Sequence, residues 1–122
     1  MKVVTYRCGA SGRDAAQELR QQANRLTVYL CQNGHVLLND FHDIDKQGDG
    51  LAAALDALRT GRGEGLLVTS LDRISRNKTE VRAVASVLRS IGAVLVTVCD
   101  GIIDPEKLVT QTAQRIASAT LS

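Results

Sequence analysis

The sequence is poor in aromatic side chains, because its 122 residues include two tyrosines, one phenylalanine and no tryptophan. A hydrophobic core must therefore be built from aliphatic residues. Apolar residues make up 44% of the chain, which is enough for a folded domain and excludes disorder by composition. The shortage of aromatic rings also disfavours binding of single-stranded nucleic acid by base stacking.

Cysteine, excess charge and long apolar runs are also scarce. Cys8, Cys31 and Cys99 are too few and too widely spaced for a disulfide framework or a zinc site. The formal net charge of +2 is far from the strongly basic profile of a stand-alone nucleic-acid-binding domain. No apolar run approaches a membrane span, and no secretory signal is recognisable. We therefore expect a cytoplasmic protein with free thiols and no bound cofactor or metal.

Strand and helix patterns alternate along the whole chain. Short apolar runs predict strands at residues 2–7, 36–41, 65–70 and 93–98. Apolar residues at helical spacing predict helices at residues 13–33, 51–61, 81–91 and 105–119. This order predicts an α/β fold: a mostly parallel sheet of four or five strands, covered by helices on both faces, in a single domain over residues 1–122.

The loops that follow the predicted strands carry charged residues. Right-handed crossovers place these loops along one edge of the sheet, at residues 8–12, 43–50, 72–77 and 100–104. Arg7 closes the first strand, and the stretch TSLDRISRN after the third strand contains Asp72, Arg73 and Arg76. Three guanidiniums that meet at one edge would favour an anion between them, and their forked donors match phosphate oxygens.

Two other interpretations of these charges remain open. An Asp-Arg-x-x-Arg loop is by itself more often a solvated helix start than a binding site. Asp43 and Asp45 suggest the acidic metal pocket of a receiver-like or flavodoxin-like domain. However, no acidic pair follows the first strand, and His35 and His42 show no metal-ligand spacing.

The order of the elements and the stretch LDRISRN resemble the catalytic domain of the serine recombinases, the resolvase and invertase family. That family has Leu-Asp-Arg, two residues and a further Arg directly after its third strand, and residues 71–76 match this pattern. The resemblance covers about residues 2–118, and further matching segments lie at residues 17–22, 32–35, 50–51, 91–94 and 100–101.

This resemblance implies a resolvase-like three-layer fold with a site for a DNA phosphodiester. In the family, a serine attacks the phosphodiester and forms a 5′-phosphoserine link, while arginines offset the growing negative charge. Arg7, Arg73 and Arg76 match three of these arginines, and Asp72 matches the acidic residue of the same motif.

The chain departs from the family pattern at the positions of the nucleophile and of one arginine. Arg7-Cys8-Gly9 stands where the family has Arg-Val-Ser, so Gly9 takes the place of the nucleophile. Ser11 is the one candidate for a displaced nucleophile, although an attacking oxygen needs a supported position. Gly48 replaces another family arginine, and Lys46 supplies a charge without the bidentate fork.

We therefore interpret the chain as a resolvase-like domain that has lost DNA strand exchange and acts as a binding or dimerisation module. We expect no separate DNA-binding domain and only weak binding of DNA or another anion, through Arg7, Lys46, Arg73 and Arg76. The last helix, residues 105–119, carries an apolar stripe that predicts a homodimer or another protein partner: Leu108, Val109, Thr112, Ile116 and Ala119. The alternative is an active or accessory serine recombinase that uses Ser11.

Overall fold

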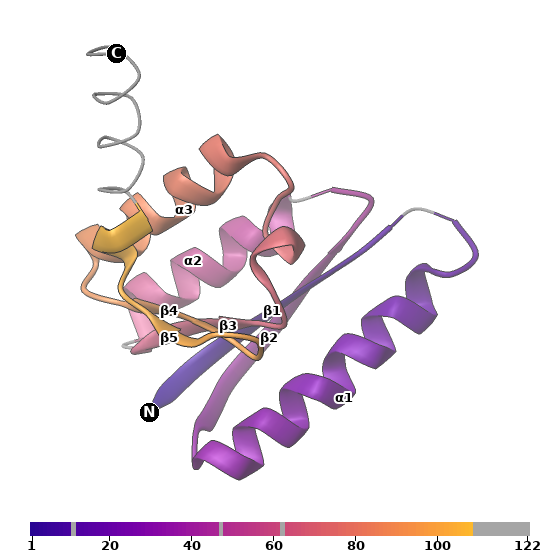
Figure 1. Ribbon diagram of the computed structural model, residues 1–122, viewed down its shortest axis with the longest axis horizontal. Coiled ribbons are helices and arrows are strands. Elements are labelled where there is room, and N and C mark those ends of the chain that lie inside the picture. The colour runs from indigo at the N-terminus through magenta and orange to yellow at the C-terminus, as the bar shows by residue number, and fades with distance from the viewer. Residues whose placement is uncertain (11, 47, 62, 109–122) are drawn as a thin grey trace.

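The computed structural model describes residues 1–10, 12–46, 48–61 and 63–108. In this part of the chain, the strands form one sheet in the order β2-β1-β3-β4-β5 (Figure 1). The strands are β1 (Lys2–Gly9), β2 (Val36–Ile44), β3 (Gly65–Val68), β4 (Val94–Thr97) and β5 (Gly101–Ile103). The first four are parallel to one another, and β5 is antiparallel to β4. The predicted mostly parallel sheet is thereby confirmed.

Helices cover both faces of this sheet. Helix α1 (Ala15–Asn33) lies on one face, whereas α2 (Asp49–Gly61) and α3 (Lys78–Ser90) lie on the other (Figure 1). A single turn of 3₁₀ helix, η1 (Leu71–Arg73), connects β3 to α3. The chain therefore has the predicted three layers, and the helices α1, α2 and α3 begin and end within a few residues of their predicted bounds.

The core is aliphatic apart from one tyrosine. The larger cluster lies between the sheet and α2 with α3, and it includes Tyr6, Leu66, Leu88 and Leu95. The smaller cluster lies under α1 and consists of Val3, Leu26, Leu67 and Val96. These side chains provide the apolar burial that stabilises the fold, as the composition predicts.

Strands β1 and β2 run further than the sequence predicts. They pair in parallel along their whole length, so that Cys8 lies opposite Asp43 and Gly9 lies opposite Ile44. The predicted loops at residues 8–12 and 43–50 therefore start two residues later. Hydrophobic periodicity does not reveal this extension, because backbone hydrogen bonds between β1 and β2, and not burial of apolar side chains, form the ends of the two strands.

Strand β5 is absent from the sequence prediction. The amide of Asp100 donates to Oγ1 of Thr97 at 2.8 Å, and Gly101 has a φ of 76°, so the chain reverses directly after β4. A strand of three residues is too short for a periodic signal. Because β5 runs back, residues 101–104 lead away from the carboxyl edge of the parallel strands.

The described start of the last helix agrees with its prediction. Residues 105–108 are helical, and Oδ1 of Asp104 accepts a hydrogen bond of 3.0 Å from the amide of Glu106. The side chain of Leu108 packs against the larger core cluster. The rest of the segment at residues 105–119 lies outside the described residues, as does Ser11. No helix of the described part is long and apolar enough to cross a membrane.

Candidate phosphate-binding cleft

An open cleft of about 350 Å³ lies at the carboxyl edge of the parallel strands. The end of β1 lines it with residues 8–10, and the loop after β2 contributes Asp45 and Lys46. The remaining lining comes from η1 and the residues after it: Asp72, Arg73, Ile74, Ser75, Arg76 and Glu80. The fold thus brings together four of the residues predicted from the sequence, which are Lys46, Asp72, Arg73 and Arg76.

A buried isoleucine fixes the turn that places the two arginines of the LDRISRN segment at the cleft. Ile74 is 1% exposed and belongs to the larger core cluster, so it anchors the turn between Arg73 and Arg76. The hydroxyl of Ser70 donates to the Asp72 carboxylate at the start of η1. This local packing holds both arginines at the rim of the cleft.

Arg73 is already paired with a carboxylate. Its Nη1 lies 3.6 Å from Oε2 of Glu18, near the start of α1, and 3.4 Å from the carbonyl oxygen of Cys8. The same Oε2 of Glu18 accepts a hydrogen bond of 3.0 Å from the amide of Ala10. Glu18 therefore links the end of β1 to η1 through the arginine.

The charges that line the cleft are balanced. Lys46, Arg73 and Arg76 are cationic, and Asp45, Asp72 and Glu80 are anionic. Cations in equal number with carboxylates hold an anion less strongly than an unopposed arginine cluster would. This balance limits the affinity of the cleft for phosphate.

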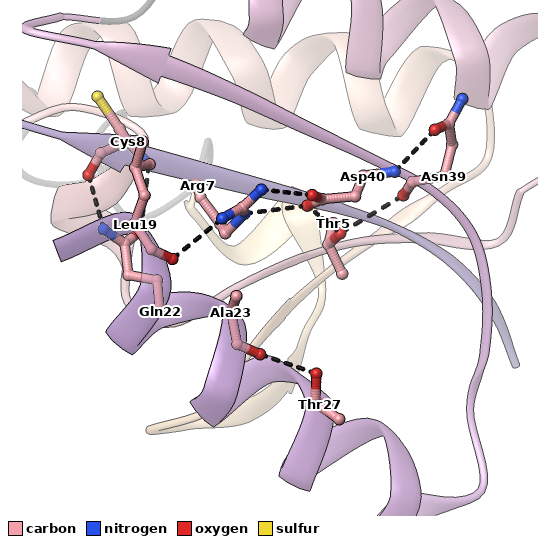
Figure 2. A network of polar contacts seen from close by, with 9 residues as sticks. All are labelled: Thr5, Arg7, Cys8, Leu19, Gln22, Ala23, Thr27, Asn39 and Asp40. Carbon is pink, nitrogen blue, oxygen red and sulfur yellow. Dashed lines mark hydrogen bonds and ion pairs between the residues drawn. The ribbon is translucent and has the colours of Figure 1, made fainter. Parts of the chain in front are cut away.

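Arg7 is not part of this cleft, and the expectation that three guanidiniums meet is wrong. Its Nη2 lies 2.6 Å from Oδ2 of Asp40, its Nε donates to Oδ1 of Asp40 at 3.2 Å, and its Nη1 donates to the carbonyl oxygen of Leu19 at 3.0 Å (Figure 2). Successive residues of a strand point to opposite faces of the sheet. Arg7 falls on the α1 face, whereas Cys8 packs against the core on the face of α2 and α3.

Position 9 also faces α1. A Cβ atom on Gly9 would lie 3.0 Å from the carbonyl oxygen of Ala15 and 3.2 Å from Cγ of Leu19. A serine side chain at this position would therefore begin in close contact with α1. Cys8, Gly9 and Ala10 all line the cleft, and none of them carries a hydroxyl.

Cys8 is a weak candidate for a nucleophile in place of serine. Its side chain is half-buried, and burial raises the pKa of its thiol above the ordinary cysteine value. A hydrogen bond with Tyr6 acts in the opposite direction but does not outweigh burial. The thiol therefore remains protonated at neutral pH, and a thiol is much less nucleophilic than a thiolate.

Gln22 supports the end of β1 and was missed in the sequence. Its side chain is 3% exposed, its Nε2 donates to the carbonyl oxygen of Cys8 at 2.8 Å, and its Oε1 accepts from the amide of Cys8 at 3.1 Å (Figure 2). β3 pairs with β1 only at Val3, Val4 and Thr5, so Gln22 completes the backbone hydrogen bonds that no strand supplies to Cys8. The available signal was a polar residue between Leu19 and Leu26, on the apolar face of a helix.

Asp43 is a structural residue. Its carboxylate accepts hydrogen bonds from the hydroxyl of Tyr6 at 2.7 Å and from the amides of Gly48, Gly50 and Leu51 at 2.8–3.0 Å. Burial raises the pKa of Asp43, but these hydrogen bonds outweigh it, so the pKa lies below the ordinary value. Within the described ranges, no group of three or more His, Cys, Asp or Glu side chains is arranged to hold a metal ion.

Sequence comparison decides the family to which this fold and cleft belong. The family model of the resolvase N-terminal domain matches residues 3–120. The chain belongs to the resolvase family. No curated protein matches the chain in sequence.

Solved structures of an integrase and of two recombinases share the fold of this resolvase-family chain. The N-terminal catalytic domain of TP901-1 integrase is 19% identical, with 100% of this chain and 99% of that chain covered and a TM-score of 0.79. A resolvase family site-specific recombinase from Streptococcus pneumoniae is 21% identical, with coverages of 98% and 87% and a TM-score of 0.78. The C-terminal catalytic domain of ISC1926 TnpA, an IS607-like serine recombinase, is 22% identical, with coverages of 80% and 70% and a TM-score of 0.72. These likenesses establish the fold.

The two arginines that the sequence groups together should differ in their effect on stability. We expect Arg7→Ala to lower the free energy of unfolding by about 2 kcal/mol, because it removes a bidentate ion pair with Asp40 and a bond to a helix carbonyl. Arg73→Ala should cost less than about 1 kcal/mol, because its single ion pair is longer and partly exposed. Urea unfolding followed by circular dichroism measures both losses, and equal losses would contradict the stronger pairing of Arg7.

Proposed function

We propose that this resolvase-family domain binds a DNA phosphodiester weakly in its cleft and does not cleave it. In this proposal, Arg73, Arg76 and Lys46 hold the phosphate, and Asp72 orients the turn that carries the two arginines. Arg7 has no contact with the phosphate and stabilises the packing of β1 against α1.

The observation that carries the proposal is the chemistry of the β1 end. In the described part of the chain, the end of β1 and the residue after it line the cleft with Cys8, whose pKa is raised, Gly9 and Ala10, and none of these three carries a hydroxyl. Transesterification of a phosphodiester needs an activated nucleophile placed against the phosphorus atom. The arginines alone can hold an anion but form no covalent intermediate.

The hydroxyl of Ser75 has a structural role. It donates to the Glu80 carboxylate and accepts a hydrogen bond of 3.0 Å from the amide of Asn77, whose own side chain caps α3. These bonds close the start of α3 and leave the hydroxyl without a free donor. Such local side-chain bonds are typical of helix N-termini.

We further propose that the domain forms a homodimer or binds another protein through residues 105–119. The apolar stripe of this segment and the membership in the resolvase family support this proposal. Leu108, its described member, is used in packing against the core of its own chain, so we assign the partner contact to the residues beyond it.

The absence of cleavage is testable with a nicked DNA duplex that traps covalent recombinase–DNA adducts. We expect no adduct on a denaturing gel, under conditions in which an active serine recombinase forms one, because loss of a nucleophile typically lowers a catalytic rate on the order of 10⁶-fold. Binding of an intact duplex should be detectable at low salt and should fall steeply as salt increases.

The Ser11→Ala and Ser75→Ala variants identify the nucleophile if an adduct appears. An adduct that disappears in Ser11→Ala alone would establish the alternative function, an active recombinase with a displaced serine. Complete absence of duplex binding at low salt would overturn the phosphate-binding role of the cleft.

A further inference from the structure

The carboxylate of Glu18 contacts two hydrogen-bond donors of the cleft lining, the amide of Ala10 and the guanidinium of Arg73. One of its oxygens, Oε2, accepts the amide hydrogen of Ala10 at 3.0 Å and lies 3.6 Å from Nη1 of Arg73. A backbone amide beside a guanidinium is a donor pair that suits a phosphate oxygen. Both donors are engaged by an acidic side chain of the same chain.

We infer that Glu18 determines how tightly the cleft binds an anion, because its carboxylate competes with the incoming phosphate for Ala10 and Arg73. This inference rests on the proposed phosphate-binding function. Glu18 is 29% exposed in its side chain and stands in the first turn of α1, so it can leave the cleft without disrupting the core.

Other carboxylates near Glu18 add to its competition with an incoming anion. Asp45, Asp72 and Glu80 already balance the three cations of the cleft lining, and Glu18 adds a fourth carboxylate beside Arg73. The described ranges give no ion pair to Lys46 or Arg76, so Arg73 is the cleft cation whose charge is directly opposed. An anion that displaces Glu18 forms an ion pair with Arg73, but the displaced carboxylate stays close enough to repel it.

The experiment compares the full chain with Glu18→Gln, using inorganic phosphate and a short DNA duplex as separate probes. Glutamine keeps an oxygen that can accept the amide hydrogen of Ala10, so the turn is retained while the competing charge is removed. Amide chemical shifts of residues 8–10 and 72–76 report binding by NMR. We expect Glu18→Gln to tighten binding roughly fivefold to tenfold, the effect of one opposed charge at this distance near a surface.

The matched control is Glu106→Gln, which removes the same charge from an exposed glutamate at the opposite edge of the sheet. A general charge effect would tighten binding in both variants, and equal gains would overturn the inference. The gain in affinity should also disappear in the Arg73→Ala background, because Glu18 then has no guanidinium for which to compete with the anion. Persistence of the gain without Arg73 would overturn it as well.

Further outcomes separate this inference from the proposed function. If the wild type and Glu18→Gln bind phosphate equally, the role of Glu18 is refuted and the cleft remains a phosphate site. If neither variant binds phosphate or the duplex, both proposals are refuted. A gain seen with the duplex alone would identify DNA, and not free phosphate, as the ligand. Should Glu18→Gln fail to fold, Glu18→Ala, which also removes the competing carboxylate, should give a gain in the same direction.

Discussion

Gly50→Ala should destabilise the protein by about 3–5 kcal/mol, although helix propensity alone predicts the opposite effect. Gly50 lies in the first turn of α2, where alanine is normally preferred over glycine by about 1 kcal/mol. A Cβ atom here would lie 2.2 Å from the carbonyl oxygen of His42 and 2.8 Å from Oδ1 of Asp43. Both neighbours belong to β2, so the helix start or the strand must move.

Gly48→Ala is the control for this prediction. A Cβ atom on Gly48 would meet only Oδ1 of Asp43, at 3.8 Å, which is ordinary van der Waals contact. Urea unfolding of the two variants should therefore give a large loss for Gly50→Ala and a change within about 1 kcal/mol for Gly48→Ala. A stabilised Gly50→Ala would show that α2 does not approach β2 as closely as described.

Asp43→Asn should lower the free energy of unfolding by about 2–4 kcal/mol. The carboxylate receives hydrogen bonds from Tyr6 and from the amides of Gly48, Gly50 and Leu51, all of which are donors. An amide group can present its oxygen to only some of them, and its own NH₂ group then faces a remaining donor. Tyr6 is fully buried, so a hydroxyl that loses its acceptor there is costly.

The same residue makes a pH dependence predictable. The pKa of Asp43 is lowered in the folded state, so its contribution to stability is present above the unfolded pKa and is lost as pH falls through the folded pKa. The difference in unfolding free energy between the wild type and Asp43→Asn should therefore stay constant from neutral pH down to the unfolded aspartate pKa of about 4 and shrink as pH falls further.

Asp56→Asn is the control, since Asp56 is an exposed aspartate of α2 with the same chemical change. It should show neither the loss at neutral pH nor the convergence in acid. A gap between the wild type and Asp43→Asn that stays constant with pH would contradict the role of the ionised carboxylate.

Most of the fold was predictable because apolar periodicity reports burial directly. The helix that begins at Ala15 and the buried strand that begins at Gly65 were found within two residues of their starts. The carboxyl ends of β1 and β2 and the short β5 were missed, because backbone pairing and a tight turn create them without an apolar pattern.

The candidate site was predictable only in part. The LDRISRN motif correctly indicated a charged turn after β3, with Arg73 and Arg76 at one cleft. Glu18 and Gln22 were not identified as functional residues, because their contacts join α1 to segments that are distant in the sequence.

The sequence by itself determined the family and the order of the elements. It also showed that the arginines of the family motif are present and that glycine takes the place of the serine after the first strand. Local patterns carry this information, because periodicity and short motifs depend on neighbours along the chain. Only the tertiary structure decided which face each residue of β1 occupies, and it placed Arg7 and Gly9 against α1 and Cys8 against the core on the opposite face. The physical reason is that a strand alternates its side chains between two faces, and the packing of α1 determines which set is covered.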